Sequence, residues 1–342
     1  MKAMVLQAES DLNENQRPLA LLELPTPVPA ADEILVRVAA CGVCHTDLDV
    51  IEGRTPPSRL PMVLGHQVVG RVAAVGSKVH RCQIGERVGV AWISSACGSC
   101  GYCLSGRENL CPEFQATGRD ANGGYAQFMT VRHEFAHPLA EGLSDAETAP
   151  LLCAGAIGYR ALRLCGLQDG QTLGLSGFGG SAHLVLRMVR QRYPRTRVFV
   201  FARGAAARAF ALELGAVWAG GFGEKAPEPL ACIIDTTPAW QPVVEALANL
   251  AAGGRLVINA IRKEEADKEA LLRLDYAAHL WQEKEIKSVA NVSRQDVREF
   301  LALATEMGIR PEIREFPLAA ANEALLTLKR GGVRGALVLL ID

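Results

Sequence analysis

The residues with the clearest chemical potential in this chain are four cysteines in one short, glycine-rich stretch. Their spacing is C-x2-C-x2-C-x7-C, and the four are Cys97, Cys100, Cys103 and Cys111. Four thiolates on one tight loop satisfy the closed tetrahedral coordination of a structural zinc ion. Zinc would then replace a hydrophobic core in holding the loop together. Because four protein ligands leave no open coordination position, this pattern predicts a structural site and no chemistry.

Two other interpretations of this cluster are less favoured. Four unligated thiols on a glycine-rich loop would be prone to oxidation. An iron–sulfur cluster is the sharper rival, because ferredoxin runs also begin C-x2-C-x2-C and end in Cys-Pro, as Cys111-Pro112 does here. The last gap in such runs is three residues, whereas it is seven in this chain. The spacing therefore favours zinc.

A second set of metal-binding residue types is spread along the chain. Cys44 lies in CGVCHTD, His66 in LGHQVVG and Cys153 in LLCAG. Two thiolates and one imidazole can hold zinc and leave a fourth position open for substrate, which is the arrangement of a catalytic site. Taken singly, each residue is also compatible with an ordinary buried cysteine or a hydrogen-bonded histidine. No role is assigned to the other four cysteines, which are Cys41, Cys82, Cys165 and Cys232.

A glycine-rich turn further along the chain matches the dinucleotide fingerprint. It reads Gly177-x-Gly179-x-x-Ala182, with Gly180 following the second glycine, between a strand-like QTLGLSG and a helix-like SAHLVLRM. Glycines in this turn let the backbone approach a pyrophosphate at the helix N-terminus. The strand before it and the helix after it make the match much more specific than the glycines alone.

The next strand, RVFVFA, indicates which dinucleotide is used. An enzyme that binds NAD usually carries Asp or Glu at the end of this strand, to bind the adenosine ribose. Here Ala202 and Arg203 stand at that point, and Arg208 follows in the next helix. No acid repels a 2′-phosphate, and a guanidinium is available to bind it. The sequence therefore favours NADP over NAD, with Arg203 as a solvated surface charge being the ordinary alternative.

The hydrophobic patterns predict two kinds of architecture. The part before residue 150 is rich in Gly, Pro and β-branched residues, and is expected to form a β-rich, barrel-like domain. A helix is expected over 151–164, after Pro150. From residue 170, apolar strands alternate with helices, which predicts a parallel sheet covered by helices. The expected strands are 171–177, 197–202, 231–235, 255–260 and 285–290, all of the buried type; the expected helices are 181–193, 205–215 and 240–253. Two more helices, over 297–308 and 320–331, and a last strand, over 335–341, follow.

Composition excludes several classes of protein. The chain of 342 residues is 49% apolar, enough for two packed domains, and 21% charged, which argues against disorder. The net charge is −1 with scattered basic residues, so a nucleic-acid binder is not expected. No signal-like N-terminus and no membrane-length apolar run is present, so we expect a soluble cytoplasmic protein.

Five motifs in fixed order carry a family resemblance. CGVCHTD, LGHQVVG, the four-cysteine loop, LLCAG and the glycine-rich turn together resemble the zinc-containing alcohol dehydrogenases of the medium-chain dehydrogenase/reductase superfamily, over essentially the whole chain. The resemblance implies an α/β protein with a GroES-like β-barrel-type catalytic domain (1–152 and 292–342) and a doubly wound Rossmann domain (153–291). It also implies hydride transfer between a small alcohol or aldehyde and NAD(P), and a homodimer or homotetramer.

The resemblance assigns roles to individual residues. It implies a catalytic zinc held by Cys44, His66 and Cys153, and a structural zinc held by the four-cysteine loop. Asp47 would orient the ring of His66 and raise its basicity. Thr46 would be the first proton-relay group, since a hydroxyl can both donate and accept. Two further implied positions are His45, near the cofactor pyrophosphate, and Trp92, as a wall of the substrate pocket.

At two positions the chain departs from the family pattern. Asp49 stands where relatives carry the histidine that ends the proton relay, so either Asp49 is the terminal base or the proton leaves directly to solvent. Gln67 stands where relatives usually carry Glu after the zinc-binding histidine. The loss of that negative charge predicts a more electrophilic zinc with less help in ligand exchange.

Two alternative functions stay open on the sequence alone. A quinone or enoyl reductase of the same superfamily would generally lack the triad of Cys44, His66 and Cys153. A non-enzymatic zinc-loop interaction module would need neither this triad nor the turn at Gly177. Metal analysis separates them, because only the dehydrogenase should hold two zinc ions per chain.

Overall fold

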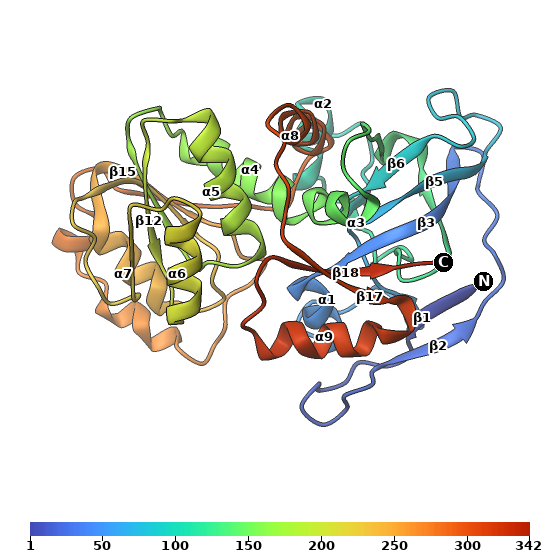
Figure 1. The fold of residues 1–342 in the computed structure, drawn as a ribbon, viewed down its shortest axis with the longest axis horizontal. Coiled ribbons are helices and arrows are strands. Elements are labelled where there is room, and N and C mark those ends of the chain that lie inside the picture. The colour runs from blue at the N-terminus through green and yellow to red at the C-terminus, as the bar shows by residue number, and fades with distance from the viewer. The chain divides into compact units, whose positions relative to one another are not determined.

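A computed structural model describes all residues from 1 to 342, and it divides into two compact units (Figure 1). The first unit combines Met1–Ala156 with Asn291–Asp342, and the second is Ile157–Ala290. The expected α/β fold, with a GroES-like part and a parallel-sheet part, is confirmed.

The first unit is built on a seven-stranded sheet in the order β10-β6-β5-β3-β18-β17, with β9 also paired to β3. The last strand, β18, pairs antiparallel with β3, so the C-terminal segment completes a sheet that the N-terminal segment begins. The strands are β3 (Glu33–Val43), β5 (Val68–Val75), β6 (Arg87–Val90), β9 (Phe128–Arg132), β10 (Ala136–Pro138), β17 (Ile313–Pro317) and β18 (Ala336–Leu340).

Smaller elements complete this unit around an apolar core. Two small sheets contain β1 (Lys2–Leu6), β2 (Leu19–Glu23) and β4 (Met62–Val63), and β7 (Ile93–Ser95) and β8 (Gln115–Ala116). The helices are α1 (His45–Ile51), α2 (Gly101–Leu104), α3 (Asp145–Thr148), α8 (Arg294–Glu306) and α9 (Ala321–Arg330). Side chains from β1, β3, β5, β18 and α9 share one buried apolar cluster, which fixes the sheet that carries the metal-binding segments.

The second unit is a six-stranded, wholly parallel sheet in the order β13-β12-β11-β14-β15-β16. The strand order reverses beside β11, and ligands of such sheets bind outside the carboxyl ends of the strands at that point. The strands are β11 (Thr172–Ser176), β12 (Arg197–Phe201), β13 (Trp218–Gly220), β14 (Leu230–Asp235), β15 (Leu250–Ile258) and β16 (Glu285–Ser288). The helices are α5 (Gly180–Arg192), α6 (Ala205–Glu213) and α7 (Gln241–Asn249). Another helix, α4 (Ala154–Cys165), spans the boundary between the two units.

Three expectations about elements are wrong. The helix expected from residue 151 begins at Ala154. Ala149–Leu152 form a 3-10 helix, and the backbone of Cys153 is not helical, with φ −127° and ψ −73°. The helix expected to reach residue 253 ends at Asn249, since β15 begins at Leu250. The strand over 285–290 is short and exposed, because β16 lies at the sheet edge with β15 as its only neighbour.

None of the helices combines the length and the apolar character needed to cross a bilayer. Cytoplasmic location remains a prediction from the sequence.

Candidate active site and metal centres

Three residues from separate segments of the first unit bring their ligand atoms together. Cys44 lies between β3 and α1, His66 lies just before β5, and Cys153 lies in the break that precedes α4. One ligand atom from each residue lies within 4.8 Å of the other two, in a site where His66 is only 1% exposed. The break at Cys153 matters because it presents the thiol between two helical segments.

The carboxylate of Asp47 organises this cluster. It accepts a hydrogen bond from the backbone N–H of Cys44 (2.8 Å) and lies 3.4 Å from Nδ1 of His66. The hydroxyl of Tyr125 also donates to it, with an O···O distance of 3.0 Å. Tyr125 is fully buried and was not identified from the sequence, because nothing in its local pattern points to a residue 78 positions away.

The chemistry of these donors fits a cation. Asp47 engages Nδ1 of His66, and Nε2 of the same ring is buried without a hydrogen-bond partner. A buried polar atom without a partner is costly unless something else satisfies it. Two cysteine sulfurs beside that nitrogen make the soft N/S set that zinc prefers.

The electrostatics of the cluster also favour binding of a cation. Burial would lower the pKa of His66, but the Asp47 carboxylate and the Cys44 sulfur outweigh it and raise the pKa to about 10. A hydrogen bond from Cys153, together with His66, holds the pKa of Cys44 well below its usual value. The protein thus gathers negative charge in a buried site, which favours occupancy by a positive ion.

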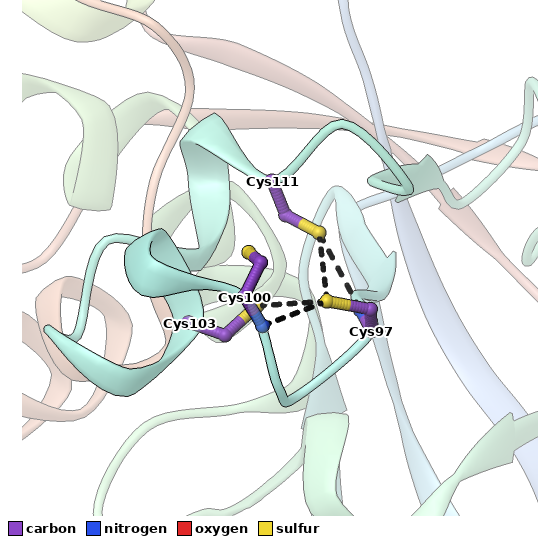
Figure 2. Close-up of side chains that lie close together, drawn as sticks. All are labelled: Cys97, Cys100, Cys103 and Cys111. Carbon is purple, nitrogen blue, oxygen red and sulfur yellow. Dashed lines mark hydrogen bonds between the residues drawn. The ribbon is translucent and has the colours of Figure 1, made fainter.

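The four-cysteine loop forms a second cluster with different geometry (Figure 2). All four sulfurs lie within 4.8 Å of one another; Sγ of Cys97 is 3.8 Å from that of Cys103 and 3.5 Å from that of Cys111. Tetrahedral zinc with Zn–S bonds of about 2.3 Å requires sulfur separations of roughly 3.8 Å. Backbone N–H groups of Ser99 and Cys100 lower the pKa of Cys97 to about 6, so the sulfur is prepared to bind as a thiolate.

The glycine-rich turn in the second unit has the form of a phosphate cradle. Gly177 follows β11 with φ +84°, and a Cβ there would lie 2.6 Å from Oγ1 of Thr236. Gly179 is the N-cap of α5, which has no side-chain cap, and a Cβ at this residue would meet no atom within 4 Å. Open space in front of uncapped helix N–H groups fits a pyrophosphate, while Ala182 is buried against the sheet side of the helix.

Comparison with known proteins agrees with this geometry. Residues 30–141 match the alcohol dehydrogenase GroES-like domain family. The chain is 45% identical to a probable alcohol dehydrogenase, AdhA, of Mycobacterium tuberculosis, over 95% of this chain and 93% of that one. It is 31% identical, over the full length of both chains, to an alcohol dehydrogenase of Geobacillus stearothermophilus. A crystal structure of an NAD-dependent alcohol dehydrogenase, 25% identical, superposes with a TM-score of 0.88 over 100% of both chains.

The chain belongs to the zinc-containing alcohol dehydrogenase family. It is an oxidoreductase of the medium-chain dehydrogenase/reductase superfamily, as the five motifs predict.

The residues predicted to form a proton relay lie in α1. Oγ1 of Thr46 lies 3.6 Å from Sγ of Cys44, and His45 is exposed at the first residue of the helix. Asp49 is 5% exposed, and Nε of Arg54 donates to its Oδ1 at 2.6 Å. Arg54 was not considered from the sequence, although its spacing of five residues from Asp49 could have suggested the pair.

Trp92 lies beside the open metal site. Its ring centroid is 6.2 Å from that of His66, and Phe114 packs edge-on against it at 5.9 Å. The Arg119 guanidinium carbon is 5.9 Å from the centroid of the Trp92 ring and is paired with Asp120. Trp92 therefore lies between His66 and Phe114, and neither Phe114 nor Arg119 was identified from the sequence.

Gln67 is 3% exposed and packs against the backbone of β3. The backbone carbonyl of Gln67 accepts a hydrogen bond from the backbone N–H of Gly42 (2.9 Å). A Cβ at Gly42 would lie 2.7 Å from the side-chain oxygen, Oε1, of Gln67. Glycine at residue 42 is therefore what makes room for this amide next to His66.

The two arginines after β12 differ in their contacts. Arg203 is exposed, whereas Nη1 of Arg208 donates to the carbonyls of Ala202 and Arg203, both at 2.9 Å. Arg208 thus holds the backbone at the end of the strand, and Arg203 leaves its guanidinium free to face solvent.

Proposed function

We propose that this alcohol dehydrogenase holds two zinc ions with separate tasks. Cys44, His66 and Cys153 would bind the catalytic ion, and the four-cysteine loop would bind the structural one. The observation that carries the first assignment is the buried Nε2 of His66, which has no hydrogen-bond partner and shares its site with two thiols. When bound, zinc would supply a Lewis acid for the substrate oxygen and keep one coordination position open to it.

The side chains around this site would prepare and move protons. Asp47, held by Tyr125 and the backbone of Cys44, fixes the ring of His66 in one tautomer. The hydroxyl of Thr46, next to Cys44, would accept the proton of a substrate alcohol and pass it on. A bound nicotinamide dinucleotide would supply the hydride acceptor, and the residues of this chain would contribute orientation and charge.

We favour solvent over Asp49 as the destination of that proton. Accepting a proton at Asp49 would break its ion pair with Arg54, whereas Thr46 is partly exposed. An Asp49→Asn variant is therefore expected to keep the wild-type pH–rate profile. A flattened profile would instead restore Asp49 as the terminal base.

The glycine-rich turn would hold the dinucleotide. Gly177, Gly179 and Gly180 would approach its pyrophosphate, and Arg203 would bind a 2′-phosphate. This favours NADP, although the 25% identical structure described above is NAD-dependent. Arg203→Ala should lower kcat/KM for NADP more than for NAD, and a wild-type enzyme with a clear NAD preference would contradict the assignment.

Trp92 and Phe114 would form an aromatic wall of the substrate site, which suits small or flat alcohols and aldehydes. A panel of primary, secondary and aromatic alcohols would define the substrate class. Trp92→Ala should shift the preference toward bulkier members of that panel; an unchanged preference would remove Trp92 from the pocket.

We also propose a homodimer through β16. This edge strand carries the exposed Ile286, and further apolar side chains of the same unit are exposed, namely Leu272, Tyr276 and Trp281. Antiparallel pairing of two copies about Ile286 would place Glu285 opposite Lys287 of the second copy, so the charges are complementary. Lys287→Glu should weaken the dimer in sedimentation experiments, because the new carboxylate would face Glu285 of the second copy. A monomeric wild type would contradict the proposal.

Metal analysis combined with kinetics tests the functional proposal as a whole. We expect two zinc ions per chain and oxidation of an alcohol coupled to reduction of NADP or NAD. One zinc per chain, with reduction of a quinone or an enoyl substrate, would favour the reductase alternative. One zinc without turnover of any of these substrates would favour a binding module.

A further inference from the structure

Two cysteines that no metal site uses meet in the second unit. Cys165 is the last residue of α4, and Cys232 is the third residue of β14, 67 positions later. β14 lies between β11 and β15, where Cys232 is in register with Leu173 and Arg255. Cys232 stands three residues before the end of its strand, roughly 10 Å from the carboxyl edge, where dinucleotides bind.

The Cys232 thiol contacts Cys165 directly. Its Sγ donates a hydrogen bond to the backbone carbonyl oxygen of Cys165 over 3.4 Å, and the two thiol groups are near enough for each to shift the pKa of the other. Each residue is 4% exposed. Neither belongs to one of the two candidate metal clusters, whose members all lie in the first unit.

A fixed positive charge lies beside this pair. Nη1 of Arg255 donates to the carbonyl of Leu164 at 2.9 Å, directly before Cys165. Nε and Nη2 of Arg255 each bind Glu285 at 2.9 Å, so the guanidinium is held in place on its other side. A held guanidinium next to a thiol stabilises the thiolate form.

Small molecules can reach the pair from solvent. A depression of about 270 Å³ is lined by both cysteines together with Gly166, Gln171, Gly253 and Arg255. Gln171 precedes β11, so the depression opens at the amino edge of the sheet, away from the glycine-rich turn. A peroxide or a small thiol fits in this volume, whereas a dinucleotide binds at the opposite edge.

We propose that Cys165 and Cys232 form a reversible dithiol–disulfide site that is oxidised by hydrogen peroxide. The thiolate of Cys232 attacks one peroxide oxygen, the O–O bond breaks, and Cys232 becomes a sulfenic acid while the leaving hydroxide takes a proton to form water. The sulfur of Cys165 then attacks that of Cys232, the S–O bond breaks, and a second water leaves with the Cys165 proton. Two thiols and one peroxide thus become one disulfide and two waters.

The assignment of the attacking sulfur rests on the surroundings of the two thiols. The hydrogen bond from Cys165 and the charge of Arg255 lower the pKa of Cys232 against the opposing effect of burial. The same hydrogen bond and burial raise the pKa of Cys165, which suits a resolving thiol. By contrast, burial raises the pKa of Cys41 and of Cys82.

The test uses the zinc-loaded, full-length enzyme treated with one to a few equivalents of hydrogen peroxide. Thiols are then alkylated under denaturing conditions and counted by mass spectrometry. The chain has ten cysteines, so we expect ten alkylated sites before oxidation, eight after it, and ten again after reduction with dithiothreitol. Peptide mapping should give a single cross-link, between Cys165 and Cys232.

Variants separate the two roles. Cys165→Ser should trap Cys232 as a sulfenic acid that dimedone labels, whereas Cys232→Ser should leave Cys165 unlabelled. Cys82→Ser is the matched control, and its disulfide should form as in the wild type. Oxidation of Cys41, Cys82 or the loop cysteines ahead of this pair, or the absence of the cross-link in wild-type enzyme, would overturn the proposal. Because the wild-type result is decisive, a variant that fails to fold leaves the test intact.

This inference does not depend on the proposed function. The cross-link would tie α4 to β14 without covering the turn at Gly177, so we expect the oxidised enzyme to keep its affinity for the dinucleotide. Loss of dinucleotide binding on oxidation, reversed by dithiothreitol, would show that the site also controls the cofactor edge.

Discussion

The two cysteine clusters of this enzyme show two ways to build a metal site. The loop cluster takes all four ligands from 15 consecutive residues, three of which are only partly buried. The open cluster takes three ligands from segments that are far apart; His66 is buried, and Cys44 and Cys153 are partly buried. We therefore expect the loop site to depend on its metal for shape, and the open site to have a shape that the protein makes before a metal enters.

The difference extends to the groups around the ligands. Asp47, Tyr125 and the backbone of Cys44 hold His66 from behind, so its ring keeps one orientation. In the loop, the sulfur of Cys97 is supported by backbone N–H groups of the loop itself. The loop is tied to the rest of its unit by Glu108, which accepts two hydrogen bonds of 3.0 Å from Arg294 at the start of α8. On the proposed assignment, the open cluster would serve chemistry and the loop cluster would serve folding.

The largest expected effect is the loss of turnover in Cys153→Ser. Removing one of three ligands from the open site should empty it, and kcat should fall by about a thousandfold or more, because metal Lewis acidity supplies several kcal/mol. The thermal unfolding midpoint should change little, since the surrounding shell is made by protein. Steady-state kinetics and zinc analysis on the same sample measure both quantities; a variant with one zinc and full turnover would contradict the assignment.

The matched change in the loop, Cys100→Ser, should lower the stability of the protein and leave its turnover nearly unchanged. Three ligands on a loop without a core of its own should fail to hold zinc, and the free energy of unfolding should fall by about 3 kcal/mol or more. The turnover of molecules that remain folded should stay close to wild type. Denaturant unfolding with kinetics on the folded fraction checks this, and a stable but inactive variant would reverse the roles of the two sites.

A smaller effect is expected behind the ligands of the open site. Asp47→Asn keeps the size of the side chain and removes its charge, so zinc affinity or kcat should fall by about 10- to 100-fold. Tyr125→Phe removes one hydrogen bond to the same carboxylate and should cost about 1 kcal/mol of stability with a milder loss of activity. Competition with a chelator and kinetics measure these changes. Equal effects of the two variants would show that Tyr125, not the charge of Asp47, controls the ring.

A further expected effect is confined to acidic pH and concerns His137, whose surroundings include Glu108 and Arg294, the pair that anchors the loop. Burial and the charges of Arg298 and Arg294 lower the pKa of His137, in β10, to about 3. Above pH 6.5 both folded and unfolded chains carry this histidine neutral. As the pH falls, only the unfolded chain takes up the proton, so stability decreases by about 2 kcal/mol between pH 7 and pH 5.

The variant His137→Gln should lack this part of the pH dependence. Urea unfolding of both proteins at pH 7 and pH 5, with zinc in excess, isolates the contribution of His137 because the other titrating groups are shared. Parallel losses of stability in the two proteins would show that another group near Glu108 is responsible.

Local patterns account for what the sequence could predict. The strands and helices of the second unit could be predicted because apolar runs alternate with amphipathic ones. The glycine-rich turn could be recognised from the spacing of its glycines between a strand and a helix. The ligands of both clusters could be named because cysteine and histidine are the residue types that zinc requires. The order of five motifs then supplied the grouping of Cys44, His66 and Cys153.

The remaining features depend on contacts that no local pattern carries. Tyr125 reaches Asp47 across 78 positions, and Glu108 meets Arg294 across 186. The break at Cys153 and the exposure of β16 depend on which neighbours those segments meet, so patterns of apolar residues misplace both. Asp49 is a further case. Its ion pair with Arg54 was not predicted from the sequence, and this pair disfavours Asp49 as the terminal base of the proton relay.

The most direct test follows turnover and site occupancy together while a chelator removes zinc from the wild-type enzyme. Native mass spectrometry gives the zinc count, and alkylation of withdrawn samples shows which cysteines have lost their metal. Turnover should fall in proportion to the exposure of Cys44 and Cys153 to alkylation, and should be independent of the state of the loop cysteines. Full turnover in enzyme whose Cys44 and Cys153 are free of metal would contradict the account.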